Sequence, residues 1–359
     1  MRIATVVGAR PQFIKCAPLS RELRKGHDEI IIHTGQHYDY EMSRVFFEEL
    51  DIPEPDYNLE VGSASHASQT GRILIAAEEV LLKERPDLAL VFGDTNSTLA
   101  GALAAAKIGI PVAHVEAGLR SYDRSMPEET NRVLTDHLSE LLFAPTKVAV
   151  ANLRKEGISK GVARSGDVMV DSLEEARQAA MKSSRVLERY DLTGKEFLAM
   201  TVHRASNTDS PESIRKIIRA IERSGLRTIF PIHPRTRKLM QDSGIVDELP
   251  ENLTVTEPLG YLDMLALMIN AKAILTDSGG MQKEAFILGV RCVTLRSNTE
   301  WPETLTEGRN RLVGLNAGRI AKALSLPRLR DAPRTHPFGK VGASGRIAKS
   351  IDIWWDRSS

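Results

Sequence analysis

The stretch VFGDTNSTLAGALAAAK, residues 91–107, shows on a small scale how this chain folds. It continues an apolar run, residues 88–92, whose length and composition are typical of a buried strand. Three polar residues follow, Asp94, Thr95 and Asn96, and then apolar residues three and four apart predict a helix over residues 99–107. Strand, short polar loop and helix in this order indicate a βαβ unit of a parallel sheet.

The same alternation runs along the chain in two series. Further strands are expected at residues 3–7, 29–33, 112–115 and 141–144, and then at 197–202, 227–232, 253–256, 273–276 and 292–295. The two halves do not align with each other, so the repetition is one of architecture. We predict an α/β protein with two lobes, each built on a parallel sheet covered by helices on both faces.

The lobes are expected to divide at the polar stretch 157–171, which we interpret as a hinge. The first lobe would then span residues 1–166 and the second residues 167–342. A last helix over residues 343–355, within a segment 343–359, would carry Trp354 and Trp355. Such large apolar rings need a surface to pack against.

Composition excludes several classes of protein. The chain has 359 residues, a formal net charge of +1 and 26% charged residues, so no basic excess indicates a nucleic-acid partner. Cys16 and Cys292 lie far apart and form neither a metal pattern nor a disulfide framework. No apolar run approaches the roughly 18 residues of a membrane span, and no signal peptide is recognisable. We expect a cytoplasmic protein without a metal site.

Charged residues follow the strands of the first lobe, where open α/β sheets bind their ligands. Asp94 follows one strand, Glu116 follows another in HVEAGLRS, and Glu128 begins a helix in MPEETNR. For each carboxylate alone, helix capping explains its position as well as function does. In VVGARPQFIK, Arg10 and Lys15 are placed to meet an anion near a helix N-terminus, although a surface turn is an equally good interpretation.

The second lobe carries different chemistry. TVHRASN offers His203 at a strand end, and LTDSGGMQKEA places Ser278, Gly279 and Gly280 at the start of a helix. Free backbone N–H groups and a hydroxyl at a helix N-terminus form a cradle for phosphate oxygens. Glu284, one turn later, would hydrogen-bond a ribose or face solvent. Together the lobes indicate a nucleotide diphosphate in one and acid-base chemistry on a sugar in the other.

These motifs, with HTGQHYD and HPRT, occur in the order and at about the spacing of the non-hydrolysing UDP-N-acetylglucosamine 2-epimerases, which the chain resembles from residue 1 to about residue 315. The resemblance implies two Rossmann-like lobes in the B-type glycosyltransferase architecture, with a C-terminal helix returning to the first lobe. It implies an isomerase that interconverts UDP-N-acetylglucosamine and UDP-N-acetylmannosamine without a cofactor, by eliminating UDP to 2-acetamidoglucal and adding it back. A homodimer is implied as well.

The resemblance also implies roles for individual residues. The acid-base carboxylates would be Asp94, Glu116 and Glu128, and a catalytic histidine near the departing phosphate would be His203. The UDP-binding positions would be Arg10, Lys15, Ser278, Gly279, Gly280 and Glu284.

The chain departs from the family pattern at two places that bear on function. Trp301 replaces a nucleotide-contacting arginine, and it would stack on a base or pack in the protein. Tyr38 and Asp39 stand where relatives activated by their own substrate have R-Q, which argues against such activation. GARPQFIK, MSRVFFEEL and GDTNSTLAGALAA also resemble the branch acting on UDP-2,3-diacetamido-2,3-dideoxyglucuronic acid. A retaining UDP-sugar glycosyltransferase and a non-catalytic UDP-sugar-binding protein remain as alternatives.

Overall fold

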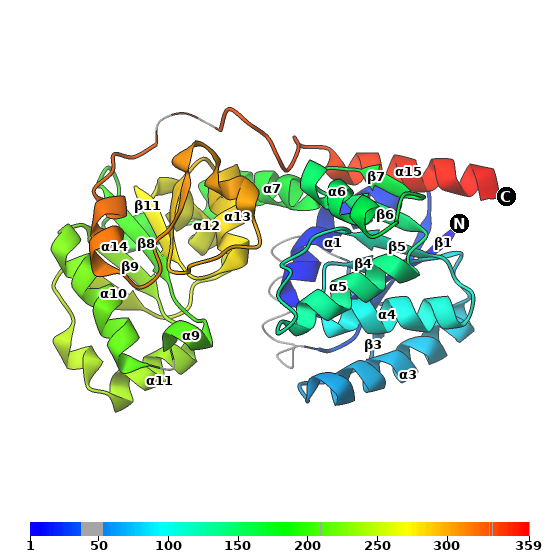
Figure 1. Cartoon of the computed structure of the whole chain (residues 1–359), viewed down its shortest axis with the longest axis horizontal. Coiled ribbons are helices and arrows are strands. Elements are labelled where there is room, and N and C mark those ends of the chain that lie inside the picture. Colours follow the sequence, from blue (N-terminus) through cyan, green and yellow to red (C-terminus); the bar gives the residue numbers. More distant parts are fainter. Residues whose placement is uncertain (37–52, 209, 330, 332, 359) are drawn as a thin grey trace. The chain divides into compact units, whose positions relative to one another are not determined.

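The computed structural model describes residues 1–36, 53–208, 210–329, 331 and 333–358 (Figure 1). Contacts within the chain divide it into two compact units. The first unit comprises Met1–Glu175 together with His336–Ser359, and the second comprises Ala176–Thr335. No helix in these described ranges is long and apolar enough to cross a membrane.

The first unit contains a seven-stranded sheet in which all neighbouring strands run parallel. Its strands are β1 (Arg2–Val7), β2 (Asp28–His33), β3 (Tyr57–Asn58), β4 (Leu88–Phe92), β5 (Val112–Val115), β6 (Leu141–Ala144) and β7 (Val162–Arg164). Their order in the sheet is β3-β2-β1-β4-β5-β6-β7. The chain therefore winds outward from β1 in one direction and then, from β4 onward, in the other.

Helices cover both faces of this sheet (Figure 1). They are α1 (Arg10–Leu23), α3 (His66–Glu84), α4 (Asn96–Lys107), α5 (Pro127–Leu138), α6 (Lys147–Lys155), α7 (Val168–Ser183) and α15 (Ala343–Ser358). Along β1, Ile3 and Val7 join a core cluster with α1 and α15, whereas Ala4 and Val6 join another with α3 and α4. Burial on both faces explains why these strands are apolar at nearly every position.

The second unit repeats the architecture with a six-stranded parallel sheet in the order β10-β9-β8-β11-β12-β13. Its strands are β8 (Phe197–Thr201), β9 (Arg227–Pro231), β10 (Leu253–Thr256), β11 (Ala273–Thr276), β12 (Arg291–Thr294) and β13 (Asn310–Leu312). Its helices are α8 (Val186–Arg189), α9 (Ala205–Thr208), α10 (Pro211–Ser224), α11 (Pro234–Asp242), α12 (Tyr261–Asn270), α13 (Gly279–Ile287) and α14 (Ala317–Leu324), with short 3₁₀ turns η1 (Ile245–Glu248) and η2 (Pro302–Gly308).

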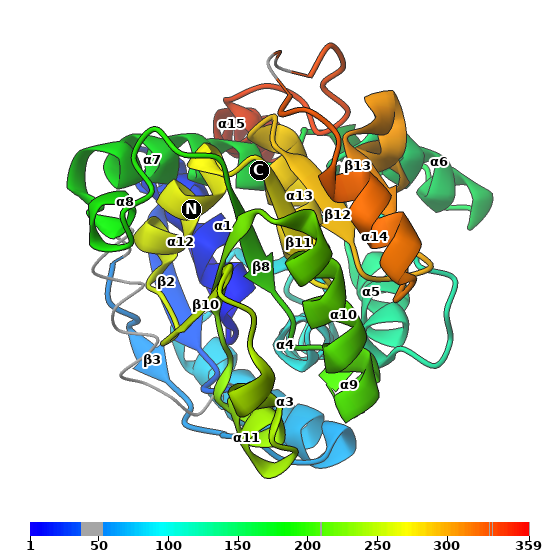
Figure 2. The ribbon, with the colours of Figure 1, turned by 90° about the vertical axis from the view of Figure 1, so that its left-hand side faces the viewer.

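Helices α10 and α14 lie side by side against the second sheet (Figures 1 and 2). Ile214 and Ile217 of α10 and Ile320 of α14 join a core cluster with Met200 of β8 and Leu275 of β11. The two lobes with parallel sheets predicted from the alternating pattern are confirmed, as are the expected core strands and the Rossmann-like architecture that the family resemblance implied.

The C-terminal helix α15 belongs to the first unit, as expected. Ala343, Ile347 and Ile351 are fully buried in the core cluster beside α1, and Trp354 packs against that cluster. Asp171 of α7 accepts hydrogen bonds from the first N–H groups of this segment, including those of Gly342 at 2.6 Å and Ser344 at 2.7 Å. A carboxylate at this end satisfies helix donors that have no intrahelical partner.

The unit boundaries differ from the expected ones. The first unit extends to Glu175 instead of Gly166, because the start of α7 packs on α1, where Ser172 Oγ donates to the Ile14 carbonyl at 2.6 Å. The stretch interpreted as a hinge, residues 157–171, is not a free linker, since it contains β7 and the start of α7. Only three residues of β7 pair, at the edge of the sheet, too few to leave a visible period in the sequence.

Candidate active site

The predicted first-lobe residues gather where the winding direction reverses between β1 and β4. The loops after β1, β4 and β5 lie together at the carboxyl edge of the sheet, which is where open α/β sheets bind ligands. Asp94 follows β4, Glu116 follows β5, and Lys15 reaches the same edge from α1. The side chain of Arg10 and residues His37, Tyr38 and Asp39 lie outside the described part of the chain.

Glu116 occupies an unusual backbone conformation. Its φ is +75°, in the left-handed region that residues with a Cβ rarely adopt. The side chain is buried and forms an ion pair with Lys15, which is itself 8% exposed. Strain of this kind persists only where surrounding contacts enforce it, and it concentrates at functional sites. The pair places a proton acceptor and a positive charge at the sheet edge.

Gly93 lies against this pair. A Cβ at position 93 would lie 3.4 Å from Glu116 Oε2 and 3.7 Å from Lys15 Nζ, and the φ of Gly93 is +66°. The positive φ favours glycine here, whereas an added Cβ would make only ordinary contacts with the pair. Because Gly93 directly precedes Asp94, this turn also sets where the Asp94 side chain begins.

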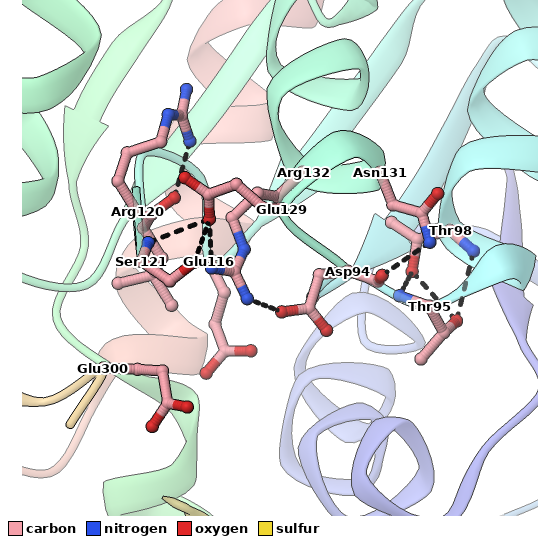
Figure 3. A network of polar contacts seen from close by, with 12 residues as sticks. Asp94, Thr95, Thr98, Glu116, Arg120, Ser121, Glu129, Asn131, Arg132 and Glu300 are labelled. Atoms are coloured by element: carbon pink, nitrogen blue, oxygen red, sulfur yellow. Dashed lines mark hydrogen bonds and ion pairs between the residues drawn. The ribbon is translucent and has the colours of Figure 1, made fainter. Parts of the chain in front are cut away.

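Asp94 is held by a second buried cation. The Arg132 guanidinium, on α5, lies between Asp94 and Glu129 and pairs with both (Figure 3), the latter at 2.7 Å. Burial alone would lower the pKa of Arg132, but the two carboxylates raise it above its ordinary value. The arginine therefore stays charged and fixes Asp94 relative to α5. The sequence offered no direct signal for Arg132, which lies 38 residues after Asp94.

Glu129 has a positioning role that separates it from its neighbour Glu128. Its carboxylate accepts hydrogen bonds from the Ser121 N–H and hydroxyl, both at 2.8 Å, and from the Tyr122 N–H at 2.9 Å. Burial opposes ionisation, but these bonds and Arg132 lower the pKa of Glu129 below its ordinary value. Glu128, half-buried in the first turn of α5, makes no hydrogen bond or ion pair among the described residues. Its carboxylate is thus available for a ligand.

In the second unit, Asp277 joins two strand-end loops. This fully buried carboxylate, directly after β11, accepts hydrogen bonds from the backbone N–H groups of His203 and Arg204 and from the Asn207 amide. The His203 ring is half-exposed, with Nδ1 3.4 Å from Asp277 Oδ1. Asp277 therefore orients His203 while its imidazole faces solvent. The position of Asp277 in the sequence, between an expected strand and Ser278, could have suggested that it orients a neighbouring loop.

The residues predicted to cradle phosphate lie at the start of α13. Ser278 is the N-cap, and its hydroxyl accepts from the Met281 N–H at 3.4 Å. Gly279 and Gly280 follow as the first helical residues, and Glu284 is half-buried one turn later. A Cβ at Gly279 would lie only 3.2 Å from Glu300 Oε2. The glycine therefore admits a close neighbour at a helix end that attracts anions.

Trp301 packs in the protein and does not lie open for a base. It is 9% exposed, and the buried Lys283 ammonium lies 4.3 Å from its ring centroid. Such a cation–π contact accounts for the ring without a ligand. The neighbouring Glu300 pairs with Arg296 at 2.7 Å and with Arg204 at 3.4 Å. Burial raises the pKa of Glu300, but Arg296 and Arg204 bring it below its ordinary value.

Comparisons with known proteins identify the family of this chain. The family model described as UDP-N-acetylglucosamine 2-epimerase matches residues 21–352. A Methanococcus maripaludis protein called a UDP-N-acetylglucosamine 2-epimerase homolog is 53% identical, over 98% of this chain and 99% of its own length. The Pseudomonas aeruginosa UDP-2,3-diacetamido-2,3-dideoxy-D-glucuronate 2-epimerase is 47% identical, also over 98% and 99%.

A solved structure is similar over nearly the whole chain. The crystal structure of Methanocaldococcus jannaschii UDP-GlcNAc 2-epimerase, in complex with UDP-GlcNAc and UDP, has a TM-score of 0.88 at 45% identity. The similarity covers 98% of this chain and 100% of that one. Among the residues described for the present chain, no group of three or more histidine, cysteine or acidic side chains could hold a metal ion.

Proposed function

The chain belongs to the UDP-N-acetylglucosamine 2-epimerase family, and we propose that it interconverts UDP-N-acetylglucosamine and UDP-N-acetylmannosamine. The observation that best supports this activity within the family is the pair of strand-end carboxylates at the reversal of the first sheet. Asp94 and Glu116 are each held by a different buried cation, Arg132 and Lys15. Helix capping requires no such arrangement.

The proposed reaction needs more than one acid-base group. The C2 proton of the sugar lies next to no carbonyl and is not acidic in the substrate. When the C1–O bond breaks, its electron pair leaves with UDP, and the cationic anomeric centre weakens the C2–H bond. A carboxylate then takes the C2 proton as the C1–C2 double bond of 2-acetamidoglucal forms. Return of UDP to C1, with a proton delivered to the opposite face of C2, gives the epimer.

We assign these tasks within each lobe. Asp94, Glu116 and Glu128 of the first lobe would transfer protons and stabilise the cationic sugar, as carboxylates do in glycoside hydrolysis. His203 of the second lobe would assist the departing phosphate. UDP binding would involve Arg10, Lys15, Ser278, Gly279, Gly280 and Glu284. Neither metal nor redox cofactor takes part in the proposed scheme.

We propose the neutral sugar as substrate in preference to an acidic one. The Pseudomonas aeruginosa relative acts, by its name, on a glucuronate, whose C6 carboxylate needs a cationic partner. Of the two arginines near Glu116, Arg120 is 8% exposed and already paired with Asp136 and Glu156, at 2.7 and 2.6 Å. Arg124 is exposed. Comparing kcat/KM for both substrates tests this choice, and a preference for the acidic sugar above about tenfold, 1.4 kcal/mol, would overturn it.

The reaction itself is tested by NMR of UDP-N-acetylglucosamine incubated with the protein in D₂O, without added cofactor. We expect UDP-N-acetylmannosamine carrying deuterium at C2, because a carboxylate that removes the proton can exchange it with solvent. Traces of glycal and free UDP should accumulate slowly. Transfer only with an added acceptor would indicate a glycosyltransferase, no chemistry would indicate a binding protein, and stoichiometric free N-acetylmannosamine would indicate a hydrolysing enzyme.

The division of labour between the lobes has its own test. Glu116→Gln should abolish turnover and leave UDP affinity nearly unchanged, whereas Ser278→Ala should weaken UDP binding by roughly 1 kcal/mol. Calorimetric titration with UDP measures both. If Glu116→Gln lost UDP binding as strongly as Ser278→Ala, the carboxylate would not have the acid-base role proposed for it.

We also propose that the enzyme is a cytoplasmic homodimer, on the basis of the family resemblance. Light scattering after size exclusion should give twice the 39.7 kDa mass of one chain. Elution at the monomer mass across micromolar concentrations would contradict the dimer. Fractionation of the source cells tests the location, and recovery of the protein outside the cytoplasmic fraction would contradict it.

A further inference from the structure

A buried histidine lies beneath the candidate acid-base residues. His114 is on β5, two residues before Glu116, and is 0% exposed. Its Nδ1 is 2.7 Å from Asp136 Oδ1, and its Nε2 is 2.7 Å from the carbonyl oxygen of Gly93. Both ring nitrogens therefore face oxygen atoms at hydrogen-bonding distance.

The acceptors determine where the protons are. A backbone carbonyl can only accept, so Nε2 must carry the proton shared with Gly93. Asp136 is held ionised independently of His114, because its Oδ2 lies 2.7 Å from the guanidinium of Arg120 and accepts from the Gly118 N–H at 3.0 Å. An ionised carboxylate also only accepts, so Nδ1 must carry a second proton. A ring with both nitrogens protonated is an imidazolium.

The charges around His114 balance in this state. Asp136 Oδ2 pairs with Arg120 at 2.7 Å and accepts from the Gly118 N–H at 3.0 Å, and Arg120 pairs with Glu156 at 2.6 Å. The half-exposed His137 lies farther out, 3.9 Å from Glu156. With His114 protonated, this cluster has two cations facing two carboxylates. A neutral His114 would leave two carboxylates, the buried Asp136 and the partly exposed Glu156, to share the single charge of Arg120.

The imidazolium is tied to the turns that carry both carboxylates. Through the Gly93 carbonyl it holds the residue directly before Asp94, and through the β5 backbone it is two residues from Glu116. Glu116 has a positive φ, which a residue with a Cβ rarely adopts, so its turn needs contacts that enforce it. Among the described residues, the charged side chains that lie next to Gly93 are those of Glu116 and Lys15.

We propose that His114 is a constantly protonated positioning residue, whose imidazolium joins Asp136 to the Gly93 carbonyl and so fixes Asp94 and Glu116 relative to each other. The role rests on the proposed function of these two carboxylates. The proton on Nε2 is never transferred to substrate. It keeps the ends of β4 and β5 in the spacing that proton transfer requires.

The protonation state can be measured directly on the wild-type protein without substrate. In nitrogen-15-labelled protein, we expect both His114 ring nitrogens to show one-bond couplings to hydrogen from about pH 6 to pH 9, with no titration. Disappearance of these signals in His114→Phe assigns them among the nine histidines. A ring with one bare nitrogen anywhere in that range overturns the proposal, whether or not the enzyme is an epimerase.

Kinetics test the positioning role. Loss of the Gly93 contact should lower kcat of His114→Phe by about 10²-fold, as expected for a small misplacement of reacting groups, with little change in KM. His137→Phe, next to Asp136 on α5 but half-exposed, is the matched control and should keep the wild-type kcat. If His114→Phe does not fold, Asp136→Asn takes its place, since it removes the Nδ1 partner charge and should lower kcat with unchanged KM. An unchanged kcat in the folded variant overturns the positioning role.

Discussion

The left-handed backbone of Glu116 leads to a prediction about stability that is independent of catalysis. Replacing Glu116 by alanine or by glycine removes the same carboxylate and the same ion pair with Lys15, so the difference between the variants reports on the backbone alone. An L-residue at φ +75° is disfavoured by about 1–2 kcal/mol, a penalty that glycine avoids. Against this, glycine lowers the free energy of unfolding by roughly 0.4–1 kcal/mol relative to alanine, because it makes the unfolded chain more flexible. Glu116→Gly should therefore be more stable than Glu116→Ala by about 1 kcal/mol.

This difference is large enough to measure by thermal unfolding. The first unit has about 200 residues, a size for which 1 kcal/mol shifts Tm by about 2–4 °C. Glu128 provides the control, because it lies in the first turn of α5, where the order should reverse and glycine should be less stable than alanine by about 0.5–1 kcal/mol. Both Glu116 variants should lack epimerase activity. Equal Tm values for the Glu116 pair, or a more stable alanine variant, would refute the reasoning.

Three further predictions concern charged contacts. Arg132→Met should lower the free energy of unfolding by about 3 kcal/mol. This is the low end for removing one partner of a buried ion pair, because Asp94 is partly exposed. A loss below about 1 kcal/mol in urea unfolding would contradict the prediction. Since the folded-state pKa of Glu129 is lowered, its stabilising contribution is present above the unfolded pKa of about 4.3 and is lost as pH falls through the folded value. The free energy of unfolding of Glu129→Gln should accordingly fall less steeply than that of the wild type as the pH is lowered. An unchanged pH dependence would show that ionisation of Glu129 does not contribute to the acid sensitivity. Trp301→Arg should destabilise the second unit by at least about 2 kcal/mol, because it replaces a buried cation–π contact with a second cation beside Lys283. Trp301→Phe should lower the free energy of unfolding by less, because it keeps an aromatic ring. A Tm equal to wild type in Trp301→Arg would argue against the contact.

The sequence was sufficient for features that depend on short stretches of chain. Strands buried on both faces appear as apolar runs, and their alternation with helices predicted both parallel sheets. The loops after these strands then indicated Asp94 and Glu116, because parallel strands bring their carboxyl ends to one edge. The short edge strand β7 could not be recognised in this way, since three residues are too few to show a period.

Contacts between distant residues could not be predicted from the sequence. The bond between His114 and Asp136 joins residues 22 positions apart, and that between Lys15 and Glu116 joins residues 101 positions apart. Each depends on how helices pack against the sheet, which local patterns do not determine. Lys15 was expected to meet an anion, and it pairs with the Glu116 carboxylate. Its contact with phosphate is part of the proposed function.

The contribution of α15 to the first unit has a consequence for synthesis on the ribosome. Ala343, Ile347 and Ile351 complete a core whose other residues belong to the first 168 positions of the chain. The intervening second unit, about 160 residues, takes about 8–32 s to translate at 5–20 residues per second. Throughout that interval the nascent first unit exposes the apolar surface beside α1 that α15 will later cover. This surface is where a chaperone would bind the unfinished chain, and where chains stalled before His336 would aggregate.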